Sequence, residues 1–325
     1  QHDYPEARTV SLEQNYRSTG RILETAKRLI STNGKRIHKD LFTDKEEGPP
    51  VEVHEAYDED DEATYVIGEV DRLIRDEKQQ PGDCAVMYRV NAQSRALEEA
   101  CLHRGMKYRL VGGVRFYRRR EVKELMAYLR LLHNPLDEVS LARVINVPPR
   151  GIGAKTLQDL AGWAQSEEMP LYTAMQTIAG LHSSGEPCPV SLTPRAVNSI
   201  TGLVELIDTL VQQAAQLKIV ELIDRVLQDT GLTRYIRDGD DRGDERWENT
   251  LELQKTAQEF NAEEPPNGLA TLLERLSLVA DVDAYEESED SITLITLHQA
   301  KGLEFPVVFI VGLEEGLLPH SRSME

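Results

Sequence analysis

The sequence predicts an α/β protein in which helices cover a mostly parallel sheet and an all-helical domain is inserted into the chain. Three observations lead to this prediction. Strand and helix signals alternate over the first third, helical periodicity alone continues from about residue 122 to residue 280, and two apolar strand signals return near the end. We therefore expect residues 1–120 and 291–325 to form one discontinuous domain and residues 121–290 to form the inserted helical domain.

The expected strands are short and rich in β-branched residues. They are TVSL (9–12), VEVHEAY (51–57), CAVMYRV (84–90), KYRLVGG (107–113), SITLITL (291–297) and PVVFIVGL (306–313). The last two are apolar on both faces, which is typical of strands in the middle of a parallel sheet. GRILETAKRLI (20–30) and ATYVIGEVDRLI (63–74) have the helical periodicity expected of connecting helices.

The inserted domain contains repeated apolar residues at three- and four-residue spacing. Helices are expected at VKELMAYLRLL (122–132), EVSLARVI (138–145), AKTLQDLAGWA (154–164), PRAVNSITGLVELIDTLVQQAA (194–215), IVELIDRVLQDT (219–230), RWENTLELQKTAQEF (246–260) and LATLLERLSLVA (269–280). Proline- and glycine-containing loops separate them.

Composition narrows the possible partners and locations. The formal net charge is −19, which opposes binding to a polyanion, yet residues 104–130 contain nine basic and two acidic residues. No apolar run is long enough to span a bilayer, so we expect no membrane association. Three widely spaced cysteines, Cys84, Cys101 and Cys188, indicate neither a disulfide framework nor a metal site, and fit a cytoplasmic protein.

The segment from Thr296 to Ser323 is the most informative. A strand, a loop and a second strand would explain its apolar residues, but not the polar Thr296, His298, Lys301 and Glu304 in the connection. Loops at the carboxyl ends of parallel strands are where ligands bind.

Four segments, in order along the chain, resemble UvrD/Rep/PcrA-type superfamily 1 DNA helicases. LEQNYRST (12–19) resembles motif IV, and TLHQAKGLEF with the residues that follow resembles motif V. YRVNAQSRALEEA (88–100) and VGGVRFYRRREVKELMAYLRLL (111–132) are similar to the segments between them. The resemblance implies a RecA-like domain of P-loop NTPase fold, the second motor domain 2A, with the helical domain 2B inserted.

The resemblance also implies a nucleotide site. Tyr16 would stack on the adenine, and Arg17 would act as a catalytic arginine finger on the γ-phosphate of ATP. Glu304 would accept a hydrogen bond from the ribose, and Gly302 would allow the backbone to approach the nucleotide. A simpler interpretation of NYRS is a helix start at which Ser18 or Thr19 is the cap, and Arg17 is available in either case.

Two groups of residues are candidates for DNA binding by the same resemblance. Arg89, Asn91 and His298 match positions near single-stranded DNA, although Asn91 alone could equally be a turn residue. The segment between two predicted helices resembles a helix-hairpin-helix turn for duplex DNA, where backbone amides would bind a phosphate; its residues are Arg150, Gly151, Ile152, Gly153, Lys155 and Thr156. The alternative is an ordinary glycine turn.

The sequence contains no G-x-x-x-x-G-K-[ST] motif and no upstream acidic metal-binding pair. We therefore expect the cofactor, ATP with Mg²⁺, to bind mainly to missing N-terminal motor domains, with no metal ligand in this chain. The parent protein would be a 3′–5′ DNA helicase that uses both single-stranded and duplex DNA, and this fragment alone would be inactive. Rotation of the inserted domain is expected at hinges near Arg119 and Asp290.

Two other functional classes remain open at this point. The chain could be a non-enzymatic duplex DNA-binding module that uses its helix-hairpin-helix-like turn. It could also come from a subunit of a helicase-nuclease complex, although the uninterrupted LEQNYRST and TLHQAKGLEF segments favour a stand-alone helicase.

Overall fold

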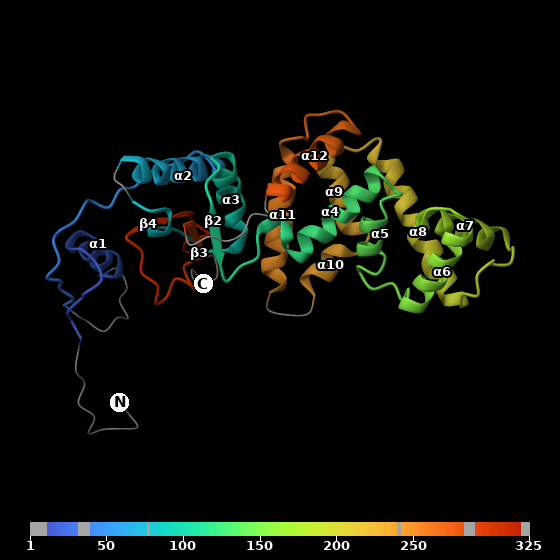
Figure 1. The fold of residues 1–325 in the computed structure, drawn as a ribbon, viewed down its shortest axis with the longest axis horizontal. Coiled ribbons are helices and arrows are strands. Elements are labelled where there is room, and N and C mark those ends of the chain that lie inside the picture. The colour runs from blue at the N-terminus through green and yellow to red at the C-terminus, as the bar shows by residue number, and fades with distance from the viewer. Residues whose placement is uncertain (1–11, 32–39, 77–78, 239–241, 283–289, 320–325) are drawn as a thin grey trace, which may run out of the picture. The chain divides into compact units, whose positions relative to one another are not determined.

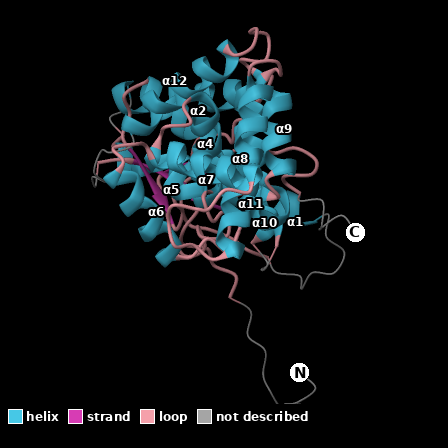
Figure 2. Cartoon of the chain, turned by 90° about the vertical axis from the view of Figure 1, so that its right-hand side faces the viewer, coloured by secondary structure: helices cyan, strands magenta, loops and turns pink. Residues whose placement is uncertain are grey.

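The computed structural model describes residues 12–31, 40–76, 79–238, 242–282 and 290–319 (Figure 1). Helices predominate over strands (Figure 2). The α-helices are α1 (Gly20–Ser31), α2 (Glu59–Asp76), α3 (Ser94–His103), α4 (Arg120–His133), α5 (Glu138–Val144), α6 (Ala154–Ser166), α7 (Leu171–Ser184), α8 (Pro194–Ala214), α9 (Ile219–Asp229), α10 (Leu232–Arg237), α11 (Gly243–Gln258) and α12 (Asn267–Val282). The strands are β1 (Cys84–Tyr88), β2 (Tyr108–Val111), β3 (Ile292–Thr296) and β4 (Val307–Ile310).

The chain divides into two compact units. One contains the described residues up to Asp58 together with Gly302–Glu304, and the other contains the remaining described residues. In the first unit, α1 follows the Asn15–Ser18 segment, and the backbone of Gln14 forms a parallel bridge with Phe42.

The second unit contains a four-stranded sheet in the order β2-β3-β1-β4, and every pairing within it is parallel. This confirms the predicted α/β class. In the register, Val86 of β1 lies opposite Leu294 of β3 on one side and Phe309 of β4 on the other. The segments that form β1 and β3 are separated by about two hundred residues of sequence, and the chain passes through the helical section between them.

One strand prediction was wrong, a second was right about the strand but wrong about its place in the sheet, and a third lies mostly outside the described residues. VEVHEAY has no strand structure, and most of its side chains are exposed. PVVFIVGL does supply β4, but at the edge of the sheet, where Val308 and Ile310 are nearly half exposed rather than buried. SITLITL is central as predicted, with every residue of β3 buried. Most of TVSL lies outside the described residues.

Two hydrophobic cores fill the second unit. The sheet core joins one face of α2 and α3 to the strands, with Ile67, Leu97, Val86 and Leu294 at its centre. The helical core runs from Phe116 to Leu276 and contains none of the sheet-core residues. Its central helix is α4, which packs against α5, α8, α9, α11 and α12.

The helices predicted in the helical section are all present. Their apolar stripes are the buried ones, as in α9, where Leu222, Ile223 and Val226 are buried. Helix α7 was not predicted from its own sequence, LYTAMQTIAGLHSS; it buries Tyr172, Met175 and Ile178 against the rest of the helical core.

Candidate functional site

The Arg17 turn, residues 14–18 before α1, is held by its own asparagine. The Asn15 side-chain oxygen accepts hydrogen bonds from the backbone amides of Arg17 at 3.0 Å and Ser18 at 2.8 Å. The Asn15 amide in turn donates to the Phe42 carbonyl at 2.7 Å. The Asn15 side chain and main-chain groups therefore hold the turn, and the Tyr16 and Arg17 side chains make none of these hydrogen bonds.

Helix α1 begins without the predicted side-chain cap. The amides of Gly20 and Arg21 donate to the carbonyls of Glu46 and Glu47, and the Thr19 hydroxyl is buried with no hydrogen-bond partner. The capping prediction for Thr19 was wrong because a distant loop satisfies these amides, an arrangement that local sequence cannot indicate.

The Tyr16 ring projects from this turn and is 75% exposed. Its hydroxyl donates to the Gln14 side-chain oxygen at 2.6 Å, and the Gln14 amide donates to Asp44 at 2.6 Å. This chain of hydrogen bonds holds the phenol at its polar end. An exposed aromatic face with a fixed orientation is suited to stacking on a planar base.

Arg17 and Glu304 lie together, although they are far apart in sequence. Arg17 Nε donates to Glu304 Oε1 at 2.7 Å, and the two side chains are 55% and 63% exposed. The backbone at Gly302 has φ +95°, and a Cβ there would meet nothing within 4 Å. Lys45, which the motifs did not indicate, donates to the Arg17 carbonyl at 2.7 Å. This unit therefore presents two cations, a carboxylate and an aromatic ring to solvent.

Two of the three residues predicted near single-stranded DNA come together at the carboxyl end of the sheet. β1 and β3 run parallel with Tyr88 opposite Thr296, so Arg89 and His298 both follow the ends of adjacent strands. Arg89 Nη1 lies 2.8 Å from His298 Nδ1. Asn91 is placed differently, because its side-chain amide donates to Glu245 of α11.

Side chains on the inner side of the turn between α5 and α6 hold its backbone by hydrogen bonds. The Asn146 side chain donates to the Ile152 carbonyl and accepts from the Ile152 amide at 3.1 Å, and Ile152 itself is buried. The Arg150 guanidinium donates to the Val144 carbonyl at 2.9 Å and to the Tyr128 hydroxyl at 2.6 Å. Arg150 and Ile152 thus shape the turn.

The outer face of the same turn carries the other predicted residues. Gly151, Gly153 and Lys155 are exposed and Thr156 is half-buried. Gly151 has φ +77°, a conformation that favours glycine, and Gly153 is the N-cap of α6. The Arg195 guanidinium lies 3.8 Å from where a Cβ on Gly151 would be. Sequence reasoning missed Arg195, since only the fold brings the start of α8 to this turn.

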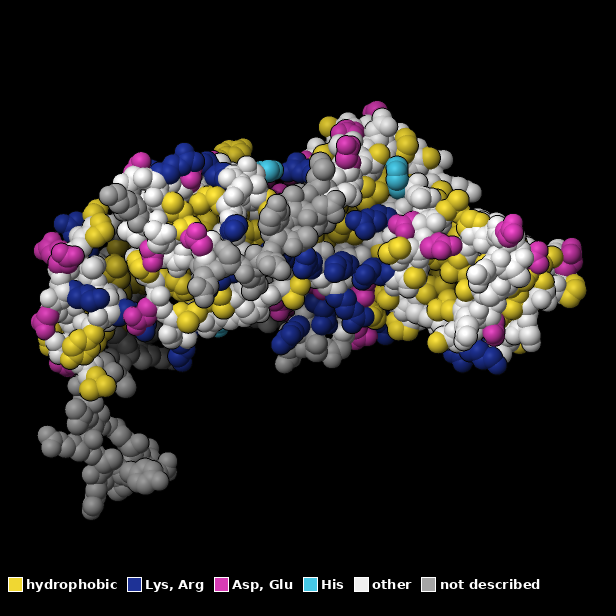
Figure 3. Space-filling view, in the orientation of Figure 1, with side chains coloured by type: hydrophobic (Ala, Val, Ile, Leu, Met, Phe, Trp, Pro, Cys, Tyr) yellow, Lys and Arg dark blue, Asp and Glu magenta, His cyan; other side chains and the backbone are white. Residues whose placement is uncertain are grey.

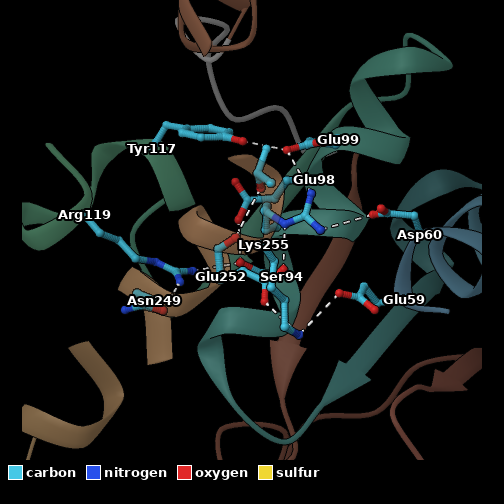
Figure 4. A network of polar contacts seen from close by, with 12 residues as sticks. Glu59, Asp60, Ser94, Glu98, Glu99, Tyr117, Arg119, Asn249, Glu252 and Lys255 are labelled. Carbon is cyan, nitrogen blue, oxygen red and sulfur yellow. Dashed lines mark hydrogen bonds and ion pairs between the residues drawn. The ribbon is translucent and has the colours of Figure 1, made fainter. Parts of the chain in front are cut away.

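A buried polar junction lies between the sheet core and the helical core (Figure 4). Arg95 of α3 is 2% exposed and contacts three carboxylates: Glu252 at 2.7 Å, Asp60 at 3.2 Å and Glu99 at 3.3 Å. Burial acts to lower the pKa of Arg95, but the charges of Glu99 and Glu252 outweigh it and raise the pKa above its usual value. Arg95 therefore stays charged inside the protein and ties α3 to α11.

A second buried arginine completes this junction. Arg119 donates to Asn249 Oδ1 at 2.6 Å, to Ser94 Oγ at 2.8 Å and to the Val114 carbonyl at 3.1 Å. Asn249 in turn donates to Glu121 at 2.6 Å. Rotation at the hinge expected near Arg119 would have to break these hydrogen bonds.

With these arrangements established, comparison with known proteins identifies the family. The family model of the UvrD-like helicase C-terminal domain matches residues 10–325. The chain belongs to this family. The prediction from the four motifs is confirmed, and the parallel sheet agrees with the RecA-like domain of UvrD-like helicases.

Named relatives of this UvrD-like chain are helicases. It is 38% identical to the ATP-dependent DNA helicase PcrA of Bacillus subtilis (strain 168) over 99% of its own length and 43% of the relative's. It is 39% identical to DNA helicase II of Escherichia coli (strain K12) over 100% of its own length and 44% of the relative's. The chain therefore spans less than half the length of the curated relatives it matches.

No group of three or more His, Cys, Asp or Glu residues in the described part of this UvrD-like chain is arranged to hold a metal ion. No helix in the described ranges is both long and apolar enough to cross a membrane.

Proposed function

We propose that this chain is part of an ATP-dependent DNA helicase that moves 3′ to 5′ on single-stranded DNA and unwinds duplex. The observation that carries the proposal is the exposed set of Tyr16, Arg17 and Glu304 in one compact unit. A base could stack on Tyr16, a ribose could reach Glu304, and the Arg17 guanidinium could neutralise charge on a transferred phosphoryl group. Folding does not require the Tyr16 ring or the Arg17 guanidinium to be exposed in this way.

ATP and Mg²⁺ fit this set only in part. The chain offers a stacking face, a carboxylate and a cation, whereas its sequence contains no phosphate-binding loop. The phosphate-binding loop and the Mg²⁺ ligands would come from N-terminal motor domains of the same protein. The chain alone would then have no ATPase activity.

The sheet core and most of the helical core support a proposed division into two domains, although Phe116 and Tyr117, which precede the boundary, belong to the helical core. Residues 1–120 with 291–325 would form domain 2A, and residues 121–290 would form domain 2B. Arg89 and His298 would contact single-stranded DNA, and Asn91 would join them only after it gives up its hydrogen bond to Glu245. Gly151, Gly153, Lys155 and Thr156 would contact a duplex phosphate, supported from inside by Arg150 and Ile152 and flanked by Arg195.

The test compares the full-length protein with this chain on duplexes that carry a 3′ or a 5′ single-stranded tail. We expect the full-length protein to hydrolyse ATP and unwind only the 3′-tailed duplex, and the chain alone to do neither. ATP hydrolysis by the purified chain, or unwinding from the 5′ tail, would contradict the proposal.

A second candidate function is a duplex DNA-binding module without enzymatic activity. The turn at Gly151 favours it, because none of the contacts that hold this turn involves Tyr16, Arg17 or Glu304. Full-length protein that binds duplex through Lys155 but has no DNA-stimulated ATPase activity would support this candidate instead.

A further inference from the structure

Basic side chains gather on one face of the helical section, over α10 and the start of α11 (Figure 3). The segment from Phe116 to Arg120, which ends at the first residue of α4, contributes to it together with α10 and the start of α11. We name this feature the basic surface and define it by Arg118, Arg120, Arg234 and Arg237, together with the rings of Tyr235 and Trp247. None of these residues belongs to the sites described above.

Each of two arginines on the basic surface is held against an aromatic ring. The Arg120 guanidinium carbon lies 5.3 Å from the centre of the Tyr235 ring, and that of Arg237 lies 5.7 Å from the Trp247 ring. Both arginine side chains nevertheless remain more than half exposed. Arg120 also donates to Glu124 and to the Tyr235 hydroxyl, so part of its guanidinium group is already engaged. Contact with a ring restricts a long side chain, so less entropy is lost when an anion binds to the remaining N–H groups.

Few contacts within the protein explain why these arginines lie on one surface. Arg120 also pairs with Glu124 at 2.8 Å, and Arg237 lies 3.9 Å from Asp244. Arg234, at the exposed side of α10, has no ion pair with any residue that the structure describes. In the described segments 116–120 and 232–238, which carry the four arginines, Asp238 is the one exposed carboxylate.

We propose that the basic surface is a separate binding site for the phosphate backbone of DNA, additional to the turn at Gly151. A chain with a net charge of −19 gains nothing from long-range attraction to DNA, so any contact has to come from such a local excess of cations. The rings are already stacked on guanidinium groups, which favours phosphate contact over base stacking. The choice of DNA as the polyanion rests on the proposed function.

The test measures binding of a short labelled duplex, and of the matching single strand, to this chain over a series of NaCl concentrations. The variant is Arg234→Gln/Arg237→Gln, and the control of equal charge is Arg75→Gln/Lys218→Gln, at exposed positions outside the basic surface. Loss of two phosphate contacts lowers the slope of log K against log salt by about 1.8 for duplex or about 1.4 for single strand. The Arg234→Lys/Arg237→Lys variant should keep most of the slope.

A variant slope equal to that of the control, on both DNA forms, would overturn the proposal, as would absence of binding by the unmodified chain at low salt. A parallel Lys155→Gln/Arg195→Gln variant separates this result from failure of the proposed function. If only that variant weakens binding, the basic surface is not a DNA site and the duplex contact at the turn stands. If neither variant alters binding, both fail.

Discussion

Arg95 and Arg17 are the same side chain in opposite surroundings. Arg95 is 2% exposed and has three carboxylates around it, while the Arg17 side chain is 55% exposed and has one. The first arginine joins two hydrophobic cores, and the second is displayed by a turn that forms without it. The difference is that the buried charge of Arg95 joins parts of the architecture, whereas the charge of Arg17 is exposed to solvent and pairs with Glu304 alone among the described carboxylates.

The largest effect is expected at Arg95. Substitution Arg95→Ala removes the buried cation nearest to Glu99 and Glu252 and leaves them only the more distant Arg275 and Lys255, which should destabilise the chain by about 3–5 kcal/mol. Urea unfolding followed by circular dichroism measures this, with the exposed Arg72→Ala as the control. A loss below about 1 kcal/mol would mean that water replaces the guanidinium and that the junction is not a buried network.

A smaller effect is expected from Asn249, the partner of the second buried arginine, Arg119. Asn249→Ala removes the acceptor for Arg119 and the donor to Glu121, so two buried polar groups lose a partner. We expect the free energy of unfolding to fall by about 1–3 kcal/mol. A double-mutant cycle with Arg119→Met should show strong coupling, and additive effects would place the two residues in independent environments.

The Arg17 turn should depend on Asn15 and not on Arg17. Asn15→Ala removes the acceptor for two amides and should cost about 1 kcal/mol locally, as loss of a helix cap does. Hydrogen exchange of the Arg17 and Ser18 amides reports it, with Arg17→Ala as the comparison. Faster exchange in Arg17→Ala than in Asn15→Ala would reverse our assignment.

The smallest effect lies at the rim of the junction, where Glu59 pairs with Lys255 at 3.4 Å. A backbone hydrogen bond lowers the pKa of Glu59 and Lys255 adds to it, while burial opposes them. A carboxyl group with a lowered folded pKa stabilises the protein above its unfolded pKa, and this contribution disappears as the pH falls through the folded pKa. Glu59→Gln should lower the free energy of unfolding by about 0.5 kcal/mol near pH 7 and by almost nothing at acidic pH, as measured by urea unfolding at both pH values. An equal loss at both pH values would mean that the charge of Glu59 is not its origin.

The sequence correctly predicted the helices and strands whose apolar residues recur at regular spacing. Strand β3 is rich in β-branched residues, central and buried throughout, and the apolar stripe of α9 predicted the buried face of that helix. Sequence failed where position in the sheet decides the outcome, because PVVFIVGL looks like β3 yet lies at the edge. VEVHEAY has alternation without any paired strand, so its pattern alone was misleading.

The sites divide in the same way. Motif order indicated Tyr16, Arg17 and Glu304, but not the pairing of Arg17 with Glu304, which are 287 residues apart. The buried junction gave no signal, since Arg95 lies in a helix with polar residues and its partner Glu252 is 157 residues away. Only the fold can show which charges are buried together.

The most direct test of the central claim is Arg17→Ala in the full-length protein, measured as DNA-stimulated ATP hydrolysis beside thermal unfolding. We predict that kcat falls by about 10³-fold or more, as for loss of an arginine finger, while ATP still binds and the unfolding temperature is unchanged. An unaltered kcat would show that Arg17 takes no part in phosphoryl transfer and would contradict the account.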